Sequence, residues 1–206
     1  MTKFETDNLE KVRKAVNVCT MCGFCKSVCP SFKEVGWDTD SSRGRITLIY
    51  GLLNGDIEAD PSVIKSIYTC TTCADCVRRC PSKVDVVDII EIARADLVKN
   101  GHMLDKHESM CDRVVEFGNP FGETASIQEA VGVERKKAKI GYYVGCTAAY
   151  RSKEISEATI SVLKKLNTDF TVVDEICCGS VLQRVGYDQD YITTMFEKNV
   201  NAIKEL

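Results

Sequence analysis

Apolar residues recur every three to four positions over most of the first 118 residues, which is the period of an amphipathic α-helix. The strongest stripe spans 84–99. Together with start and stop signals such as Asp60-Pro61 and Asn54-Gly55, the pattern predicts five helices. They are expected at 7–17, from Ser42 as the N-cap to Leu53, from Pro61 toward Cys70, at 84–99 and at 104–117. This part of the chain should therefore be all-helical.

The period changes after residue 138. Two short apolar runs, 140–144 and 170–173, have the length of buried strands, and each precedes a helical stripe. A strand–helix–strand connection this short predicts parallel pairing of the two strands. The stretch 119–138 begins with the chain breaker Asn-Pro-Phe-Gly and predicts a linker.

The predicted fold class is therefore mainly α. An all-helical domain at 1–118 is followed by the linker at 119–138 and by the first part of an α/β domain at 139–206, in parallel β-α-β-α order. The chain has 206 residues and 44% apolar side chains, which is enough for one or two such cores.

Charge and the amino terminus narrow the possible partners. The net charge of −3 argues against nucleic acid as a general partner. The polar stretch 1–7 lacks the apolar region of a signal peptide, and no run approaches the roughly 18 apolar residues of a membrane-spanning helix. We expect a cytoplasmic protein without a transmembrane segment of its own, with docking on the inner face of the membrane through a partner left open.

Eight of the twelve cysteines form two copies of one pattern, C-x2-C-x2-C-x3-C-P. This is the iron–sulfur run of bacterial two-cluster ferredoxins, in which the fourth cysteine of each run ligates the other cluster. We therefore predict two [4Fe–4S] clusters and two ligand sets. The first cysteine set is Cys19, Cys22, Cys25 and Cys80, and the second cysteine set is Cys70, Cys73, Cys76 and Cys29.

Disulfides and zinc are the competing interpretations of these eight cysteines. Disulfides suit small secreted domains, and nothing in this chain indicates secretion. Zinc ribbons pair two C-x2-C units, whereas here a third cysteine follows at the same spacing and a fourth precedes proline, twice over. A zinc-stabilised scaffold without a redox role stays open as a function of another class.

Three further cysteines follow the two predicted strands. Cys146 comes directly after the first strand, and Cys177 and Cys178 follow the second. Because ligands bind beyond the carboxyl ends of parallel strands, we expect these three thiols to line one crevice. The alternative is that they are ordinary core residues.

The twelfth cysteine and three aromatic residues are expected to be structural. Cys111 lies on the apolar face of a predicted helix without a partner cysteine nearby, which predicts a buried thiol. Phe24, Phe32 and Trp37 could shield a cluster from water, but core packing is the favoured interpretation.

The whole pattern resembles the iron–sulfur subunits that contain CCG domains. The motifs that show the resemblance are the two cysteine runs, Ser-Arg-Gly-Arg-Ile at 42–46, Asn-Pro-Phe-Gly at 119–122, Tyr-Val-Gly-Cys-Thr at 143–147 and Cys-Cys-Gly at 177–179. The family includes the catalytic subunits of heterodisulfide reductases, the iron–sulfur subunits of glycolate and lactate oxidases, and the iron–sulfur C subunit of anaerobic glycerol-3-phosphate dehydrogenase.

The resemblance implies an iron–sulfur electron-transfer subunit of an oxidoreductase complex. Electrons would pass between a flavoprotein or haem partner and a CCG site, with a disulfide or a hydroxy acid as the substrate of the whole complex. Heterodisulfide reductase is the favoured parent, and a glycolate, lactate or glycerol-3-phosphate dehydrogenase complex is the alternative. Cys146, Cys177 and Cys178 become candidate ligands of a third, non-cubane cluster.

The chain departs from the family pattern in one respect. Family members place a C-x2-C pair downstream of Cys-Cys-Gly and then repeat the domain, but none of the 28 residues after Cys178 is a cysteine. The catalytic site is therefore expected to be incomplete in this chain. It would be an amino-terminal fragment, a split-gene product whose partner subunit supplies the rest of the CCG domain, or a degenerate member.

Overall fold

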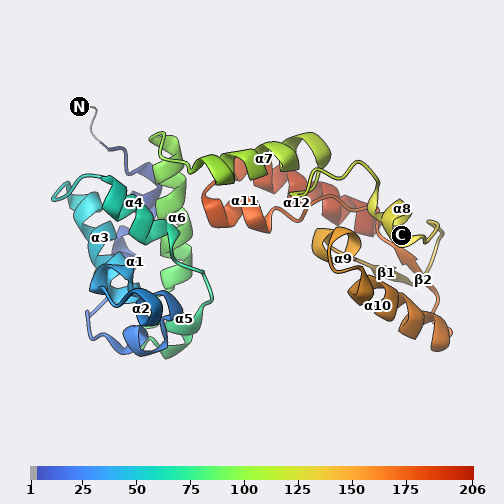
Figure 1. Ribbon diagram of the computed structural model, residues 1–206, viewed down its shortest axis with the longest axis horizontal. Coiled ribbons are helices and arrows are strands. Elements are labelled where there is room, and N and C mark those ends of the chain that lie inside the picture. The colour runs from blue at the N-terminus through green and yellow to red at the C-terminus, as the bar shows by residue number, and fades with distance from the viewer. Residues whose placement is uncertain (1–3) are drawn as a thin grey trace. The chain divides into compact units, whose positions relative to one another are not determined.

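A computed structural model of the chain describes residues 4–206, which divide into two compact units. The first unit extends to Met103 and also includes Arg184–Tyr187. The second comprises Leu104–Gln183 and Asp188–Leu206. Figure 1 shows the elements of both units. Within residues 4–206, no helix is both long and apolar enough to cross a bilayer.

The first unit consists of helices alone within its described residues. Four longer helices, α1 (Asp7–Asn17), α3 (Ser42–Asn54), α4 (Pro61–Tyr68) and α6 (Val86–Lys99), lie side by side (Figure 1). The short elements η1 (Phe24–Val28), α2 (Pro30–Val35), η2 (Asp38–Asp40) and α5 (Asp75–Arg79) lie within the cysteine runs or follow the first run. The periodic stripes predicted the long helices, whereas the short ones have too few turns to show a period.

N-terminal caps fix the starts of α4 and α3. The Asp60 carboxylate accepts hydrogen bonds from the N–H groups of Ser62 and Val63, as predicted for the N-cap of α4. The N-cap of α3 is Ser41, whose hydroxyl accepts from the Gly44 N–H at 3.0 Å, so the expectation of Ser42 as the cap was wrong by one residue.

The core of the first unit is a single apolar cluster between these helices. Leu9, Ile49, Ile67, Ile89 and Leu97 are fully buried in it. The buried Asp96 carboxylate on α6 accepts the Leu9 N–H at 2.8 Å and the Asn8 N–H at 3.1 Å, which fixes the start of α1 against α6.

The second unit contains a small parallel sheet. Strand β1 (Ile140–Tyr142) pairs with β2 (Phe170–Val172), with Ile140 opposite Phe170, so the predicted parallel pairing is confirmed. Helices α9 (Cys146–Tyr150) and α10 (Lys153–Lys165) connect the strands, and α12 (Gln189–Lys204) is the last element. The intervening α11 (Ser180–Val185) is divided between the two units.

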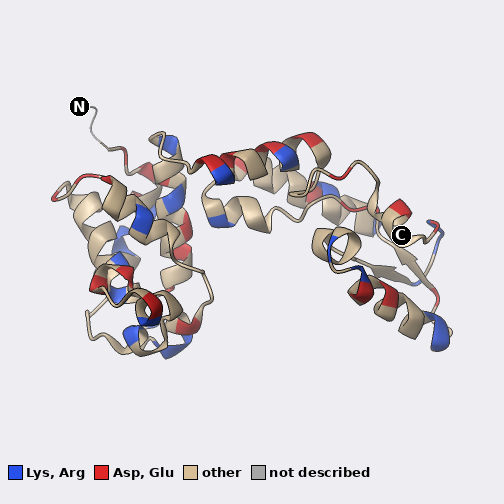
Figure 2. Cartoon of the chain, viewed as in Figure 1, with Lys and Arg blue, Asp and Glu red and all other residues tan. Residues whose placement is uncertain are grey.

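Two features of the second unit differ from the expected organisation. Helix α7 (Asp105–Phe117), expected to belong with the helical domain, is grouped with the second unit, where the Gly118 carbonyl after α7 accepts the Cys177 N–H at 2.7 Å. The expected linker contains α8 (Ile127–Val131), which begins with a capping box between Ser126 and Glu129. Helices α6 and α7 each carry both acidic and basic side chains (Figure 2).

Candidate metal centres

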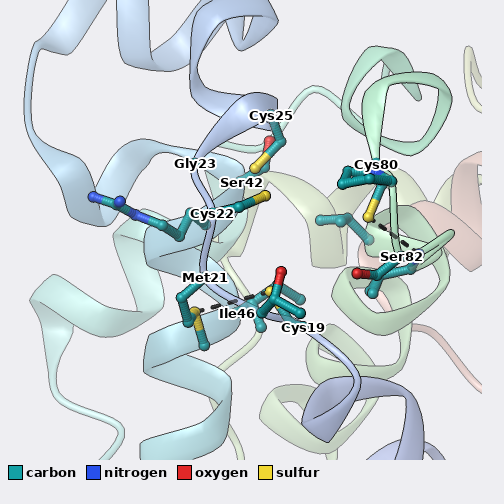
Figure 3. Close-up of a pocket in the computed structure, with 14 residues that line it drawn as sticks. Cys19, Met21, Cys22, Gly23, Cys25, Ser42, Ile46, Cys80 and Ser82 are labelled. Carbon is teal, nitrogen blue, oxygen red and sulfur yellow. Dashed lines mark hydrogen bonds between the residues drawn. The ribbon is translucent and has the colours of Figure 1, made fainter.

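The first cysteine set surrounds one cavity. Cys19, Cys22 and Cys25 line one side of it, and Cys80, from the end of α5, faces them across the space (Figure 3). The cavity comprises about 400 Å³ of empty space, including its opening to solvent. The Cys80 sulfur accepts a hydrogen bond from the Val84 N–H at 3.3 Å. The fourth cysteine of the second run therefore lies with the first three of the first run.

The second cysteine set surrounds another cavity in the same unit. Cys70, Cys73 and Cys76 line it together with Cys29, and its empty space is about 280 Å³. All eight thiols are free, and none forms a disulfide. Among residues 4–206, no three cysteine, histidine or acidic side chains converge on a point that one ion could occupy. Four cysteine thiols around each cavity are the donor set that a [4Fe–4S] cluster requires.

The two cysteine runs repeat the same unusual backbone conformation. Met21 and Thr72, each just before the second cysteine of its run, have φ values of 54° and 50°. Gly23 and Ala74, each just after that cysteine, have φ values of 82° and 63°. Positive φ costs a residue other than glycine about 1–2 kcal/mol. Strain of this kind persists where the surroundings impose it, and it gathers at ligand clamps.

The protonation of the thiols bears on their ability to bind metal, because the thiolate is the ligand. A hydrogen bond from the Phe24 N–H lowers the pKa of Cys22. Burial opposes ionisation of Cys29, but hydrogen bonds from Ser31, the Phe32 N–H and Ser42 outweigh it and lower the pKa. Burial raises the pKa of Cys76 to about 11.

Ser42 occupies a position that the sequence did not reveal. This buried residue at the start of α3 lines both cavities, and its hydroxyl hydrogen-bonds the Cys29 and Cys76 thiols. The Ser-Arg-Gly-Arg motif was part of the family resemblance, but it did not indicate that this segment lies between the two cysteine sets.

The third group of thiols lies in the second unit, at the carboxyl ends of β1 and β2. A hydrogen bond from Cys177 lowers the pKa of Cys146, and another joins Cys177 to Cys178, so the Cys177 side chain contacts both of the other thiols. Cys177 is buried and Cys178 is exposed. The structure therefore brings these thiols together, as expected, and a crevice lined by all three stays a prediction.

A buried glutamate beside these thiols was missed by the sequence analysis. Glu175 Oε1 accepts hydrogen bonds from the N–H groups of Val144 and Gly145 at 3.0 and 2.7 Å, whereas its Oε2 atom is buried without a hydrogen-bond partner. Burial raises the pKa of Glu175 to about 7. Its contacts join the segment after β1 to the segment after β2, which keeps Cys146 near Cys177.

The remaining candidates have mixed outcomes. Cys111 on α7 is fully buried, as expected, and burial raises its pKa to about 11. Phe24 and Trp37 are 63% and 73% exposed, so the expectation that they pack in the core was wrong. Phe32 is half-buried, with the Lys26 ammonium 4.6 Å above its ring.

Two family models match the chain. Residues 15–84 match the 4Fe-4S dicluster domain, and residues 140–206 match the cysteine-rich domain. The first match contains both cysteine sets, and the second contains the three contacting thiols.

The chain is also similar to several curated proteins. It is 31% identical to the D subunit of the dihydromethanophenazine:CoB–CoM heterodisulfide reductase of Methanosarcina acetivorans, over 97% of this chain and 55% of that protein. It is 29% identical to the B subunit of the fumarate reductase (CoM/CoB) of Methanothermobacter marburgensis, over 93% of this chain and 40% of that protein. It is 31% identical to the C subunit of the H(2):CoB–CoM heterodisulfide,ferredoxin reductase of Methanothermobacter thermautotrophicus, over 60% of this chain and 67% of that protein. The chain therefore spans about half the length of the first of these relatives.

Proposed function

This chain belongs to the CCG-domain iron–sulfur proteins, and from that premise we propose that it is an electron-transfer subunit of an oxidoreductase complex. The first cysteine set would hold one [4Fe–4S] cluster and the second cysteine set would hold another. Such clusters, when bound, each accept and release one electron. The observation that carries the proposal is that each cavity is lined by three cysteines of one run and the fourth of the other.

The residues of the chain contribute three things to this role. The helical packing keeps the sulfurs of Cys29 and Cys76 away from bulk water. Donors such as the Val84 N–H and the Ser42 hydroxyl reach the cysteine sulfurs. The burial of a cluster and the hydrogen bonds to its sulfurs are the factors by which a protein sets its reduction potential.

We infer the redox partners of this chain from the proteins that it resembles. Subunits of heterodisulfide reductases are among the proteins that the chain resembles, so we favour a complex of that type, with a flavoprotein or haem subunit exchanging electrons with the chain. The iron–sulfur subunit of a glycolate, lactate or glycerol-3-phosphate dehydrogenase complex is the alternative within the same class.

Anaerobic reconstitution of the chain with iron and sulfide tests the proposal. We expect about eight iron atoms per chain and the brown colour of two cubanes. Binding of zinc instead, with no visible absorption, would support the structural scaffold and end the redox interpretation. Replacing Cys80 by Ser should alter the EPR signal of the cluster at Cys19, Cys22 and Cys25. Damage confined to the other cluster would show that the ligand sets are wrongly assigned.

Reduction of a disulfide substrate is a second candidate, supported by the contact between the Cys146, Cys177 and Cys178 thiols. These cysteines would hold a further cluster once another polypeptide or a longer chain completes the CCG site. Turnover of a mixed disulfide with an artificial electron donor would support this function. A chain that gains no third cluster in the presence of its partner subunits would contradict it.

A further inference from the structure

The two cysteine sets differ in the charge buried around them. The side chain of Arg45, on α3, is fully buried, and its Nη1 atom lies 3.8 Å from the sulfur of Cys29 in the second cysteine set. The nearest carboxylate is that of Asp40, at 3.9 Å from Nη2. The shorter hydrogen bonds of the guanidinium go to neutral oxygens: the Ser66 carbonyl at 2.5 Å and the Ser31 and Thr69 hydroxyls at 3.0 Å.

A second buried arginine approaches the same set from α6. Arg94 is 4% exposed and donates to four backbone carbonyls, among them that of Cys70 at 2.7 Å. Because arginine stays protonated in proteins, both residues bring a positive charge into the interior.

The first cysteine set has no such buried cations in the described part of the chain. Its neighbouring cations are Arg43 and Lys26, whose side chains are 30% and 26% exposed. Both pair with the same carboxylate, Asp38, at 2.5 and 2.8 Å. Solvent screens these charges, and Asp38 compensates them in part.

The buried charges of Arg45 and Arg94 change the energy of adding an electron to the second site. A buried charge without full compensation is costly, and nearby negative charge lowers that cost. Four thiolates make a loaded site anionic, and reduction adds one more negative charge. Arg45 and Arg94 therefore stabilise the reduced form of the second site more than Arg43 and Lys26 stabilise that of the first.

We propose that Arg45 and Arg94 make the second cysteine set the site of higher reduction potential, so that a single electron delivered to the chain resides there. The inference rests on the proposed function, since both sets must hold cubane clusters. Neither arginine is a ligand. Arg45 would affect the potential through its contact with the Cys29 sulfur, and Arg94 through its contact with the Cys70 backbone.

An anaerobic redox titration of the reconstituted chain with dithionite, followed by EPR, tests the proposal. The signal of the second site is identified as the one that changes in a Cys73→Ser chain. In the unaltered chain this signal should appear first. Arg45→Gln keeps hydrogen-bond donors but removes the charge, so the reduced-to-oxidised ratio of the second site at fixed potential should fall at least tenfold, which is 59 mV for a one-electron couple.

Three matched variants separate charge from structure. Arg45→Lys should restore most of the ratio because it keeps the charge, Arg94→Gln should lower it as Arg45→Gln does, and Arg43→Gln should leave the second site unchanged. If the first-site signal appears first in the unaltered chain, the proposal fails, whether or not the variants fold. If Arg45→Lys behaves like Arg45→Gln, lost packing rather than lost charge is responsible, and the proposal also fails. A chain that binds no cubanes would refute the proposed function instead.

Discussion

Gly44 should tolerate no side chain, because the backbone of the preceding turn occupies the space that a Cβ atom needs. A Cβ built on Gly44 would lie 1.8 Å from the Asp38 carbonyl oxygen and 2.8 Å from the Thr39 Cα atom. Real contacts of a Cβ atom essentially never fall below 3.0 Å, so the start of α3 or the η2 turn would have to move by about 1 Å. Gly44→Ala therefore perturbs the segment that places Ser42 and Arg45 beside the cysteine sets.

The magnitude follows from two opposing effects. Overpacking costs about 1–3 kcal/mol, and this case lies near the upper end because both clashing groups are backbone. Alanine returns up to about 1 kcal/mol through its better helix propensity. The net destabilisation should be about 2 kcal/mol, which lowers the melting temperature of a unit of this size by roughly 10 °C.

The assay is thermal unfolding of the reconstituted chain, followed by far-UV circular dichroism and by the visible absorption of the clusters. Gly51→Ala is the matched control on the same helix, because its Cβ atom would meet only the flexible side chain of Ile57, at 3.1 Å. The control should change the melting temperature little. A Gly44→Ala chain that melts within about 2 °C of the unaltered chain would refute the close approach of α3 and η2.

Three further predictions concern other parts of the chain. Asp96→Ala should destabilise the first unit by about 3 kcal/mol in chemical denaturation, because the buried Leu9 N–H and the half-buried Asn8 N–H lose their acceptor. A loss below about 0.5 kcal/mol, typical of surface changes, would contradict this role. Ala74→Gly should raise stability by about 1 kcal/mol by relieving a positive φ, whereas Gly23→Ala at the equivalent place in the other run should lower it, and equal effects of both changes would count against the shared conformation. Burial raises the pKa of Cys111 from 9.0 to about 11, so its thiolate population should be about 100-fold below that of an unperturbed thiol. Alkylation of Cys111 in the folded chain, followed by mass spectrometry, should therefore be slow. Rapid alkylation would overturn its assignment as a buried structural residue.

Much of the fold follows from local pattern. The stripe at 84–99 predicted α6 (Val86–Lys99), and the stripe at 7–17 predicted α1 with the same bounds. These helices are long enough for their apolar faces to show a period, so periodicity located them without knowledge of their partners. The short helices could not be found in this way, and α8 inside the expected linker is an example.

Cysteine spacing also identified which thiols to group. In each run a proline follows the fourth cysteine, as in two-cluster ferredoxins, where that cysteine ligates the other cluster. This pattern predicted the two cysteine sets, and each set lines one cavity in the structure. The contact of Cys146 with Cys177 followed from strand order, because parallel strands end at the same edge of a sheet.

The sequence by itself determined the helical periods, the parallel strand pair and the grouping of the cysteines, because each of these depends on spacing along the chain. Only the tertiary structure decided which charges are buried. Arg45 and Arg43 are two residues apart on one helix, yet one is fully buried near Cys29 and the other is paired with Asp38 in partial contact with water. The tertiary structure likewise decided that Glu175, which follows β2, is buried and accepts hydrogen bonds from the segment after β1. Burial and close approach are set by segments distant in sequence, and the strength of an electrostatic interaction depends on both.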